Sequence, residues 1–270
     1  MQYVLDRYSF SLSRACGLVG LSRSSWHYRS GRDDSEVIDM LDSLSDQKPE
    51  EGFWKLYGRI RMAGLEWNHK RVHRVYKMMG LNLKRKKKRR LPARVKEPLT
   101  VSEAINETWS ADFMSDVLTS GRRFRVFTLI DDFNRECLAL EVDSSLAAER
   151  VVRILDRVLE ARGKPEKIRM DNGPEFISHA FGLWAERNEV QIQFIQPGKP
   201  TQNGYIERFN KSYRSGVLDA YLFDSMQQVR HLSEIWRMDY NYHRPHDALG
   251  RIAPVRVATF DRTVSLVTYQ

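Results

Sequence analysis

The sequence lacks any apolar run approaching the roughly 18 residues that a membrane span needs, and residues 1–11 lack the apolar core of a signal peptide. Both absences predict an intracellular protein with no membrane partner. Cysteine is also scarce, because Cys16 and Cys137 are the only two among 270 residues and neither belongs to a Cys-x-x-Cys pair. A disulfide framework is therefore not expected, and both thiols are predicted to be reduced and buried.

One segment lacks acids altogether and carries the excess positive charge. The net charge is +9, and the nine basic residues between positions 84 and 96 account for all of it. Seven of them are consecutive: Lys84, Arg85, Lys86, Lys87, Lys88, Arg89 and Arg90. Because like charges repel one another in a folded core, we predict an exposed connector that binds nucleic-acid phosphates. A solvated linker without a ligand and a nuclear-import signal are the alternatives.

The first 83 residues have a helical pattern. Two short helices broken at Gly20, the second capped by Ser22, outline a helix-turn-helix, although helical hairpins that bind nothing share this outline. A second helical block covers residues 35–83. Between residues 54 and 80 its basic residues outnumber the acids by six, which favours DNA contact over a merely solvated face. The candidate contacts there are Lys70, Arg71 and Arg74.

After residue 100 the pattern changes to strands. The predicted strands cover residues 108–117, 123–130, 137–142, 167–170 and 192–195. The first three are spaced as antiparallel hairpins, and predicted helices at 147–161 and from Phe176 onward separate the later ones. This order predicts an α/β fold, in which a mixed sheet is covered by helices.

The segment from Gln196 to Arg214 is a loop rich in proline and glycine, followed by a helix that Thr201 or Asn203 can cap. One apolar stripe repeats with a helical period: Ile206, Phe209, Tyr213, Val217 and Ala220. A second stripe is polar: Glu207, Asn210, Lys211 and Arg214. Such a helix can bring a carboxylate to a metal and a phosphate, while a surface glutamate with ordinary ion pairs is the alternative.

Three acids are placed where an α/β fold gathers its ligands. Asp112 lies within the first predicted strand, Asp171 directly follows the fourth, and Glu207 is on the helix. Carboxylate oxygens suit Mg²⁺ or Mn²⁺, and two ions about 4 Å apart can activate an attacking hydroxyl and stabilise the leaving oxygen of a phosphodiester. Periodicity alone does not exclude three rivals of Asp112, which are Asp116, Asp131 and Asp132.

The sequences around these acids resemble a known family. The motifs are WSAD ending at Asp112, DNGPEF starting at Asp171 and NGYIERFN around Glu207, and 35 residues separate Asp171 from Glu207. Residues 100–260 thereby resemble the catalytic core of retroviral integrases and of bacterial insertion-sequence transposases of the OrfB type. The segment from Tyr240 to His246 resembles the family's C-terminal signature, and residues 35–83 resemble its upstream helical domain.

The resemblance implies an RNase H-like core, a mixed five-stranded sheet with flanking helices, preceded by a small all-α helix-turn-helix-like domain. It implies that Asp112, Asp171 and Glu207 are catalytic and bind two Mg²⁺ or Mn²⁺ ions. Arg214 is implied as the basic residue that contacts the end of the element, with Asn210 and Lys211 as neighbouring candidates for DNA contact. Retroviral integrases also carry an N-terminal His/Cys zinc module, whose spacing is missing here, so zinc is not expected.

The implied partner is double-stranded DNA, both the terminal repeats of the element and the target, bound by a homo-oligomer. Proteins of the OrfB type are often made as fusions to the product of an upstream reading frame, so that product is expected as a fusion or partner. The expected location is the bacterial cytoplasm, in association with the nucleoid. The predicted domains are residues 1–83 (helical, DNA-binding), 84–99 (basic linker), 100–260 (catalytic) and 261–270 (tail).

The predicted activity is metal-dependent DNA cleavage and strand transfer at the ends of an insertion sequence by a DDE-type transposase. Two alternatives remain: a DNA-binding regulator that uses the basic half of the chain alone, and an RNase H-type nuclease that acts on hybrids. Among the other polar residues, His179, His231 and His246 are interpreted as surface or capping residues. For Arg244, a DNA-end contact stays open.

Overall fold

The structure is a computed structural model that describes residues 2–28, 33–83, 102–196 and 200–261. The chain divides into two compact units, Met1–Asp39 and Met40–Gln270, and the boundary falls inside helix α4 (Ser35–Gln47). The basic run from Lys84 to Arg90 lies outside the described residues, so its predicted role as an exposed connector stays a prediction.

The first unit contains three short helices, α1 (Gln2–Arg7), α2 (Leu12–Val19) and α3 (Arg23–His27). Gly20 ends α2 in the left-handed region with φ +67°, which a residue without Cβ adopts without strain. The hydroxyl of Ser22 accepts a hydrogen bond from the backbone N–H of Ser25, which confirms Ser22 as the cap of α3. The helical prediction for this region is therefore confirmed, while its contact with DNA stays a prediction.

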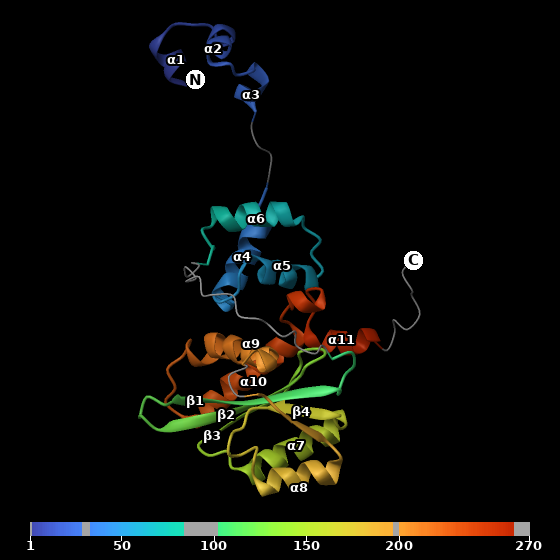
Figure 1. Cartoon of the computed structure of the whole chain (residues 1–270). Coiled ribbons are helices and arrows are strands. Elements are labelled where there is room, and N and C mark those ends of the chain that lie inside the picture. Colours follow the sequence, from blue (N-terminus) through green and yellow to red (C-terminus); the bar gives the residue numbers. More distant parts are fainter. Residues whose placement is uncertain (1, 29–32, 84–101, 197–199, 262–270) are drawn as a thin grey trace, which may run out of the picture. The chain divides into compact units, whose positions relative to one another are not determined.

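The second unit holds the remaining helices and all strands of the described residues (Figure 1). After α4 its helices are α5 (Phe53–Met62), α6 (His69–Met78), α7 (Ala148–Arg162), α8 (His179–Asn188), α9 (Gly204–Tyr213), α10 (Met226–Tyr242) and α11 (Pro254–Asp261). Its strands are β1 (Thr108–Val117), β2 (Arg123–Asp131), β3 (Cys137–Asp143), β4 (Lys167–Met170) and β5 (Gln191–Phe194). None of the described helices is both long and apolar enough to span a bilayer.

The strands form one mixed sheet in the order β3-β2-β1-β4-β5. The pairs β1–β2 and β2–β3 are antiparallel, as their hairpin spacing predicts, and β4 pairs in parallel with both β1 and β5. Short crossovers through α7 and α8 make these parallel pairs possible. The central position of β1 places the middle of this strand between the antiparallel and the parallel halves of the sheet.

Two apolar cores sandwich the sheet, because alternate side chains of β1 point to opposite faces. Trp109 and Ala111 are buried in the core formed with α7 and α8. Met114 belongs to the other core, together with side chains of α9 and α10. Figure 1 shows these helix pairs on opposite faces of the sheet. Trp109 is among the largest side chains that are fully buried.

Helices α5 and α6, with the part of α4 from Met40 onward, belong to the same compact unit as the sheet. The guanidinium of Arg59 donates two hydrogen bonds to Glu51 (2.7 and 2.9 Å) and two to Asp239 of α10 (2.9 and 2.7 Å). Arg244 donates a further one to Glu51 at 3.1 Å. This buried network, which we call the Arg59 network, joins the helical segment to the end of α10.

The helix after residue 203 departs from the predicted pattern at its end. Its apolar residues Ile206, Phe209, Tyr213 and Val217 are buried, as the 3.6-residue stripe predicts, but Ala220 is exposed. The reason is a π-helical turn at Arg214–Leu218, after which the helix stops. The predicted second stripe also divides, because Asn210 is buried while Glu207 is exposed.

A glycine in this π-helical turn allows close packing, and its replacement gives a stability prediction. A Cβ on Gly216 would lie 2.6 Å from Nε1 of Trp236, so Gly216→Ala is expected to lower the free energy of unfolding by about 1–3 kcal/mol. Gly182→Ala in α8, where nothing lies within 4 Å of the added Cβ, is the control. It should stabilise the protein by up to about 1 kcal/mol. Urea unfolding measures the free energy of unfolding of both variants. If Gly216→Ala and Gly182→Ala change it in the same direction, the close packing of Gly216 is contradicted.

Candidate active site

Asp112 lies in the middle of β1 on the face that packs against α9. Its carboxylate accepts a hydrogen bond from Nδ2 of Asn210 at 2.7 Å and one from the backbone N–H of Phe113 at 2.8 Å. In the register of the sheet Asp112 is opposite Thr128 of β2. The carboxylate is thus held between the sheet and α9, and its orientation is fixed from both.

Asn210 is the residue that fastens α9 to this position. It is 8% exposed, and its Oδ1 accepts a hydrogen bond from the Thr128 hydroxyl at 3.0 Å while Nδ2 donates to Asp112. The sequence suggested Asn210 as a candidate for DNA contact, and that role stays untested. Its hydrogen bonds also give it a positioning role, which sequence reasoning missed although Asn210 lies three residues from Glu207, close to one helical turn.

Asp171 directly follows β4. The parallel register pairs Ser110 with Arg169, so extending it by two residues brings Asp171 alongside Asp112. The Oδ1 atom of Asp171 accepts a hydrogen bond from the backbone N–H of Gly173 at 3.0 Å. A Cβ on Gly173 would lie 3.0 Å from the same oxygen, so the tight turn after β4 favours glycine.

Glu207 is exposed in the first turn of α9, and electrostatics links it to the other two acids. Burial raises the pKa of Asp112 to about 6, and repulsion from Asp171 and Glu207 adds to this effect, while hydrogen bonds from Phe113 and Asn210 oppose it. Asp171 and Glu207 therefore both lie near enough to Asp112 to repel its carboxylate. Within the described residues, however, no three His, Cys, Asp or Glu side chains stand close enough to form a ready metal site.

The three rivals of Asp112 have structural partners. Asp116 forms an ion pair with Arg214 at 3.1 Å. Asp131 is fully buried and accepts backbone hydrogen bonds from residues 106 and 133. Asp132, also fully buried, accepts one from the Ser110 hydroxyl at 2.7 Å and pairs with Arg169 at 2.9 Å. Because each rival carboxylate already has a structural partner, Asp112 is favoured over all three as the candidate acid of β1 and β2.

The cations suggested as DNA contacts lie in several places. Arg214 pairs with Asp116 and donates to the backbone carbonyl of Ser115, while Lys211 is exposed on α9. On α6, Lys70 and Arg74 are exposed, and Arg71 is partly buried with its guanidinium 6.0 Å from the ring centre of Trp67. The contact of these cations with DNA stays a prediction.

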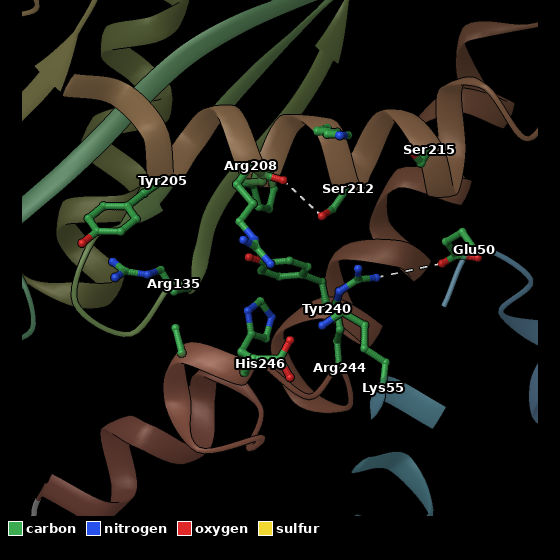
Figure 2. Close-up of a pocket in the computed structure, with 14 residues that line it drawn as sticks. Glu50, Lys55, Arg135, Tyr205, Arg208, Ser212, Ser215, Tyr240, Arg244 and His246 are labelled. Atoms are coloured by element: carbon green, nitrogen blue, oxygen red, sulfur yellow. Dashed lines mark hydrogen bonds and ion pairs between the residues drawn. The ribbon is translucent and has the colours of Figure 1, made fainter. Parts of the chain in front are cut away.

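A basic pocket of about 670 Å³ lies beside α9 (Figure 2), and Glu207 is not among the residues that line it. Fourteen residues line it: Glu50, Lys55, Arg135, Tyr205, Arg208, Phe209, Lys211, Ser212, Ser215, Tyr240, Arg244, His246, Asp247 and Ala248. His246, interpreted as a surface or capping residue, lies at the N-cap position of the 3₁₀ turn Asp247–Leu249, and its side chain is partly buried in this wall. Its Nε2 is buried and finds no hydrogen-bond partner among the described residues.

The residues of the C-terminal signature connect three parts of the second unit. Asn241 exchanges two hydrogen bonds with the backbone of Cys137 in β3 (2.8 and 2.9 Å). Lys55 donates to the carbonyl of Pro245 at 2.8 Å, and a Cβ on Gly58 would lie 2.7 Å from the ring of Pro245. Arg244 is 7% exposed and bonded to Glu51, so its placement favours a structural role over the DNA-end contact.

Comparison with known families identifies the class of this fold and site. Residues 102–200 and residues 188–254 each match a family described as "Integrase core domain". The structure is also similar to a chain of the simian T-cell lymphotropic virus intasome in complex with PP2A regulatory subunit B56 gamma. The TM-score is 0.52 at 14% identity, over 79% of this chain and 74% of that one. The fold of residues 102–254 is therefore RNase H-like and of the integrase type.

Two relatives extend the match over the whole chain. An insertion element IS407 protein of 31.7 kDa from Burkholderia multivorans is 39% identical over 98% of this chain and 96% of its own length. An insertion element IS476 protein of 39.2 kDa from Xanthomonas euvesicatoria is 36% identical over 96% of this chain and 76% of its own. The chain belongs to the insertion-sequence transposases of the retroviral integrase-like superfamily.

Proposed function

We propose that this transposase carries out metal-dependent cleavage and strand transfer of DNA at the ends of its insertion sequence. The observation that carries the proposal is the gathering of three acids from β1, the end of β4 and α9: Asn210 of α9 holds Asp112 at 2.7 Å, the parallel register brings Asp171 alongside, and Glu207 is in the first turn of α9. The raised pKa of Asp112, to which burial and then repulsion from Asp171 and Glu207 contribute, supports it. Such an accumulation of negative charge disfavours the empty protein, and a cation bound there would relieve it. These are also the three acids at the spacing that the family resemblance singled out.

The donor set fits a hard divalent cation. Carboxylate oxygens without histidine or thiolate favour Mg²⁺ or Mn²⁺ over zinc. Bound there, a pair of such ions would lower the pKa of the attacking water and stabilise the leaving oxygen. Because the described residues form no ready metal site, the acids have to approach one another further when ions and DNA bind. Glu207 suits this adjustment, since its side chain is exposed while Asn210 fixes Asp112.

Two chemical steps follow from this arrangement. In the first, water attacks the phosphodiester at the end of the element, its P–O bond breaks, and a 3′-hydroxyl is released. In the second, the oxygen of this hydroxyl attacks a target phosphodiester and the displaced oxygen leaves, with no covalent intermediate on the protein. The carboxylates of Asp112, Asp171 and Glu207 hold the reacting centre, and Asn210 keeps Asp112 aimed at it.

The remaining parts of the chain are proposed to hold DNA and to assemble on it. Lys70, Arg71, Arg74, Lys211 and Arg214 would contact phosphates, with the run of basic residues at 84–90 as the connector. The four predicted segments are kept as functional divisions, with residues 1–83 binding DNA and residues 100–260 catalysing the reaction. A homo-oligomer would join two element ends in the bacterial cytoplasm at the nucleoid, with the upstream-frame product as fusion or partner.

A cleavage assay tests this function. The full chain, with and without the upstream-frame product, is incubated with labelled DNA carrying the element ends, in Mg²⁺ or in EDTA. We expect Mg²⁺-dependent nicks at the ends and joined products on target DNA, both missing in Glu207→Gln. Equal nicking by Glu207→Gln would remove the enzyme assignment in favour of a regulator. Degradation of RNA strands in hybrids, with terminal repeats ignored, would indicate an RNase H-type nuclease.

A further inference from the structure

The helix that carries Glu207 presents three different faces. Ile206, Phe209 and Tyr213 point into the core. Glu207 and Asn210 lie on the face toward Asp112. Tyr205, Arg208, Ser212 and Ser215, at steps of three, four and three, line the basic pocket. Because one residue turns the helix by about 100°, the pocket face and the acid face are separated by more than a third of a turn.

The pocket has positive charge that no side chain within the described residues neutralises. Arg208 and Lys211 make no side-chain hydrogen bond or ion pair with any described residue. Arg135 stacks its guanidinium 3.4 Å from the ring centre of Tyr205, yet its Nη1 is buried without a hydrogen-bond partner among the described residues. The lining holds five cations and two acids, Glu50 and Asp247, and Glu50 lies 3.9 Å from Arg244. Even with each acid neutralising one cation, at least three cations remain for a ligand.

The crowding of these cations changes the neighbouring titratable groups. Burial, followed by the charges of Lys55, Arg244, Arg135 and Arg208, lowers the pKa of His246 to about 3. Burial and the charge of Arg244 also lower the pKa of Lys55 to about 8, and Asp247 and Glu51 offset this only in part. The imidazole is thus neutral, and its unpartnered Nε2 can donate a hydrogen bond. Figure 2 shows Arg208 extending from α9 toward Tyr240 and His246.

These groups fit a phosphate. Two guanidinium groups and an ammonium supply charge-assisted donors, and His246 and the hydroxyl of Ser215 supply neutral ones, while the hydroxyl of Ser212 donates to the backbone carbonyl of Arg208 at 3.1 Å. We propose that this pocket binds backbone phosphates of the transposase's DNA substrate on the far side of α9 from the catalytic acids. The inference rests on the proposed function, since it takes DNA to be the substrate of the acids.

The size of the helix gives the position of the contact along the strand. An α-helix with its side chains is about 10–12 Å across, and each nucleotide of a B-form strand advances about 3.4 Å along the axis. A strand whose scissile bond lies at the acids would thus place in the pocket a phosphate roughly three nucleotides away. The pocket would fix the strand at a second point and so help to set which phosphodiester is cut.

DNA affinity of the full chain tests the pocket without requiring catalysis. In a Glu207→Gln background, fluorescence anisotropy with duplex DNA carrying the element end is measured for Arg208→Gln and Arg135→Gln. Arg153→Gln on α7 is the charge-matched control, since Arg153 is exposed and its side chain makes no hydrogen bond or ion pair with the described residues. Each pocket variant is expected to bind about 5–10-fold more weakly near 0.1 M salt, with a salt slope reduced by about one phosphate.

Two further arms make the result specific. A methylphosphonate, which removes one phosphate charge, placed about three nucleotides from the cleaved bond should weaken binding by the parent but not by Arg208→Gln. Affinity and salt slope of both pocket variants equal to those of Arg153→Gln would overturn the proposal. Arg208-dependent binding of inorganic pyrophosphate with unchanged DNA affinity would also overturn it, in favour of a small phosphorylated ligand. If the pocket variants bind DNA more weakly and the chain with Glu207 intact does not cleave DNA in Mg²⁺, the pocket is upheld while the catalytic assignment fails.

Discussion

Asp112→Asn is expected to lower the rate of end cleavage by about 10³-fold or more while making the metal-free protein more stable. An amide offers a cation one neutral oxygen in place of a shared negative charge, so the reacting centre loses its fixed ligand. A 10³-fold loss corresponds to about 4 kcal/mol of transition-state stabilisation. Cleavage of labelled element-end DNA under single-turnover conditions measures it.

The stability gain follows from the pKa of the carboxyl group. In the folded protein this pKa is about 6, against an ordinary value of 3.8. Below pH 3.8 both states are protonated and Asp112 costs nothing. Between pH 3.8 and about 6 the unfolded state loses its proton while the folded state keeps it, so stability falls across this range and stays lower above pH 6. Above pH 6 Asp112→Asn should gain about 1–2 kcal/mol in EDTA.

A matched control separates the two effects. Asp116→Asn, whose carboxylate pairs with Arg214, should show no stability gain above pH 6. Added Mg²⁺ should raise the melting temperature of the parent more than that of Asp112→Asn. A parent and an Asp112→Asn variant that cleave equally well would contradict the role of Asp112, whatever their stabilities.

Arg59→Leu is expected to lower the free energy of unfolding by about 3–5 kcal/mol. Although burial opposes the charge, hydrogen bonds with Glu51 and Asp239 raise the pKa of the Arg59 guanidinium, which shows how closely the three are coupled. The side chain of Glu51 is 0% exposed. Without Arg59 it keeps Arg244 at 3.1 Å but loses two hydrogen bonds, and Asp239 keeps Lys48 at 3.0 Å. Chemical denaturation measures the loss.

Two variants control this prediction. Arg61→Leu, two residues further along the same helix, breaks an exposed ion pair with Glu66 at 3.6 Å. It should lower the free energy of unfolding by less than about 0.5 kcal/mol. The double variant Arg59→Leu with Glu51→Gln removes the uncompensated charge, so it should recover part of the loss. If Arg59→Leu unfolds no more easily than Arg61→Leu, the Arg59 network does not hold the helical segment to α10.

The strands and the candidate acids could be predicted because their signals are local. Alternation along β1 separates Trp109 and Ala111 from Asp112 on the opposite face, and the structure has the same strand bounds that the pattern predicts. The turn after β4 is determined by Asp171 and Gly173, which lie two residues apart. In such cases the residues that decide the conformation are neighbours in the chain.

Partners that are distant in the sequence explain what could not be predicted. Lys55 and Arg59 contribute to the basic surplus that favoured a DNA-facing helix, yet both turn inward. Their partners, Pro245 and Asp239, are 190 and 180 residues away. The pocket around His246 arises in the same way, from segments that meet only in the folded chain. Charge composition shows how many cations a segment holds, but it does not show which of them form hydrogen bonds or ion pairs within the folded protein.

The π-helical turn at Arg214–Leu218 determines where this helix can change in length. Removing a residue inside α9 would rotate everything beyond the deletion by about 100° and separate Glu207 from Asn210 or from the core aromatics. Removing one from the wide turn would instead tighten it to an ordinary α-helical turn and leave Gly204–Tyr213 in register. A single deletion here is thus expected to leave Glu207 and Asn210 in their positions relative to the sheet.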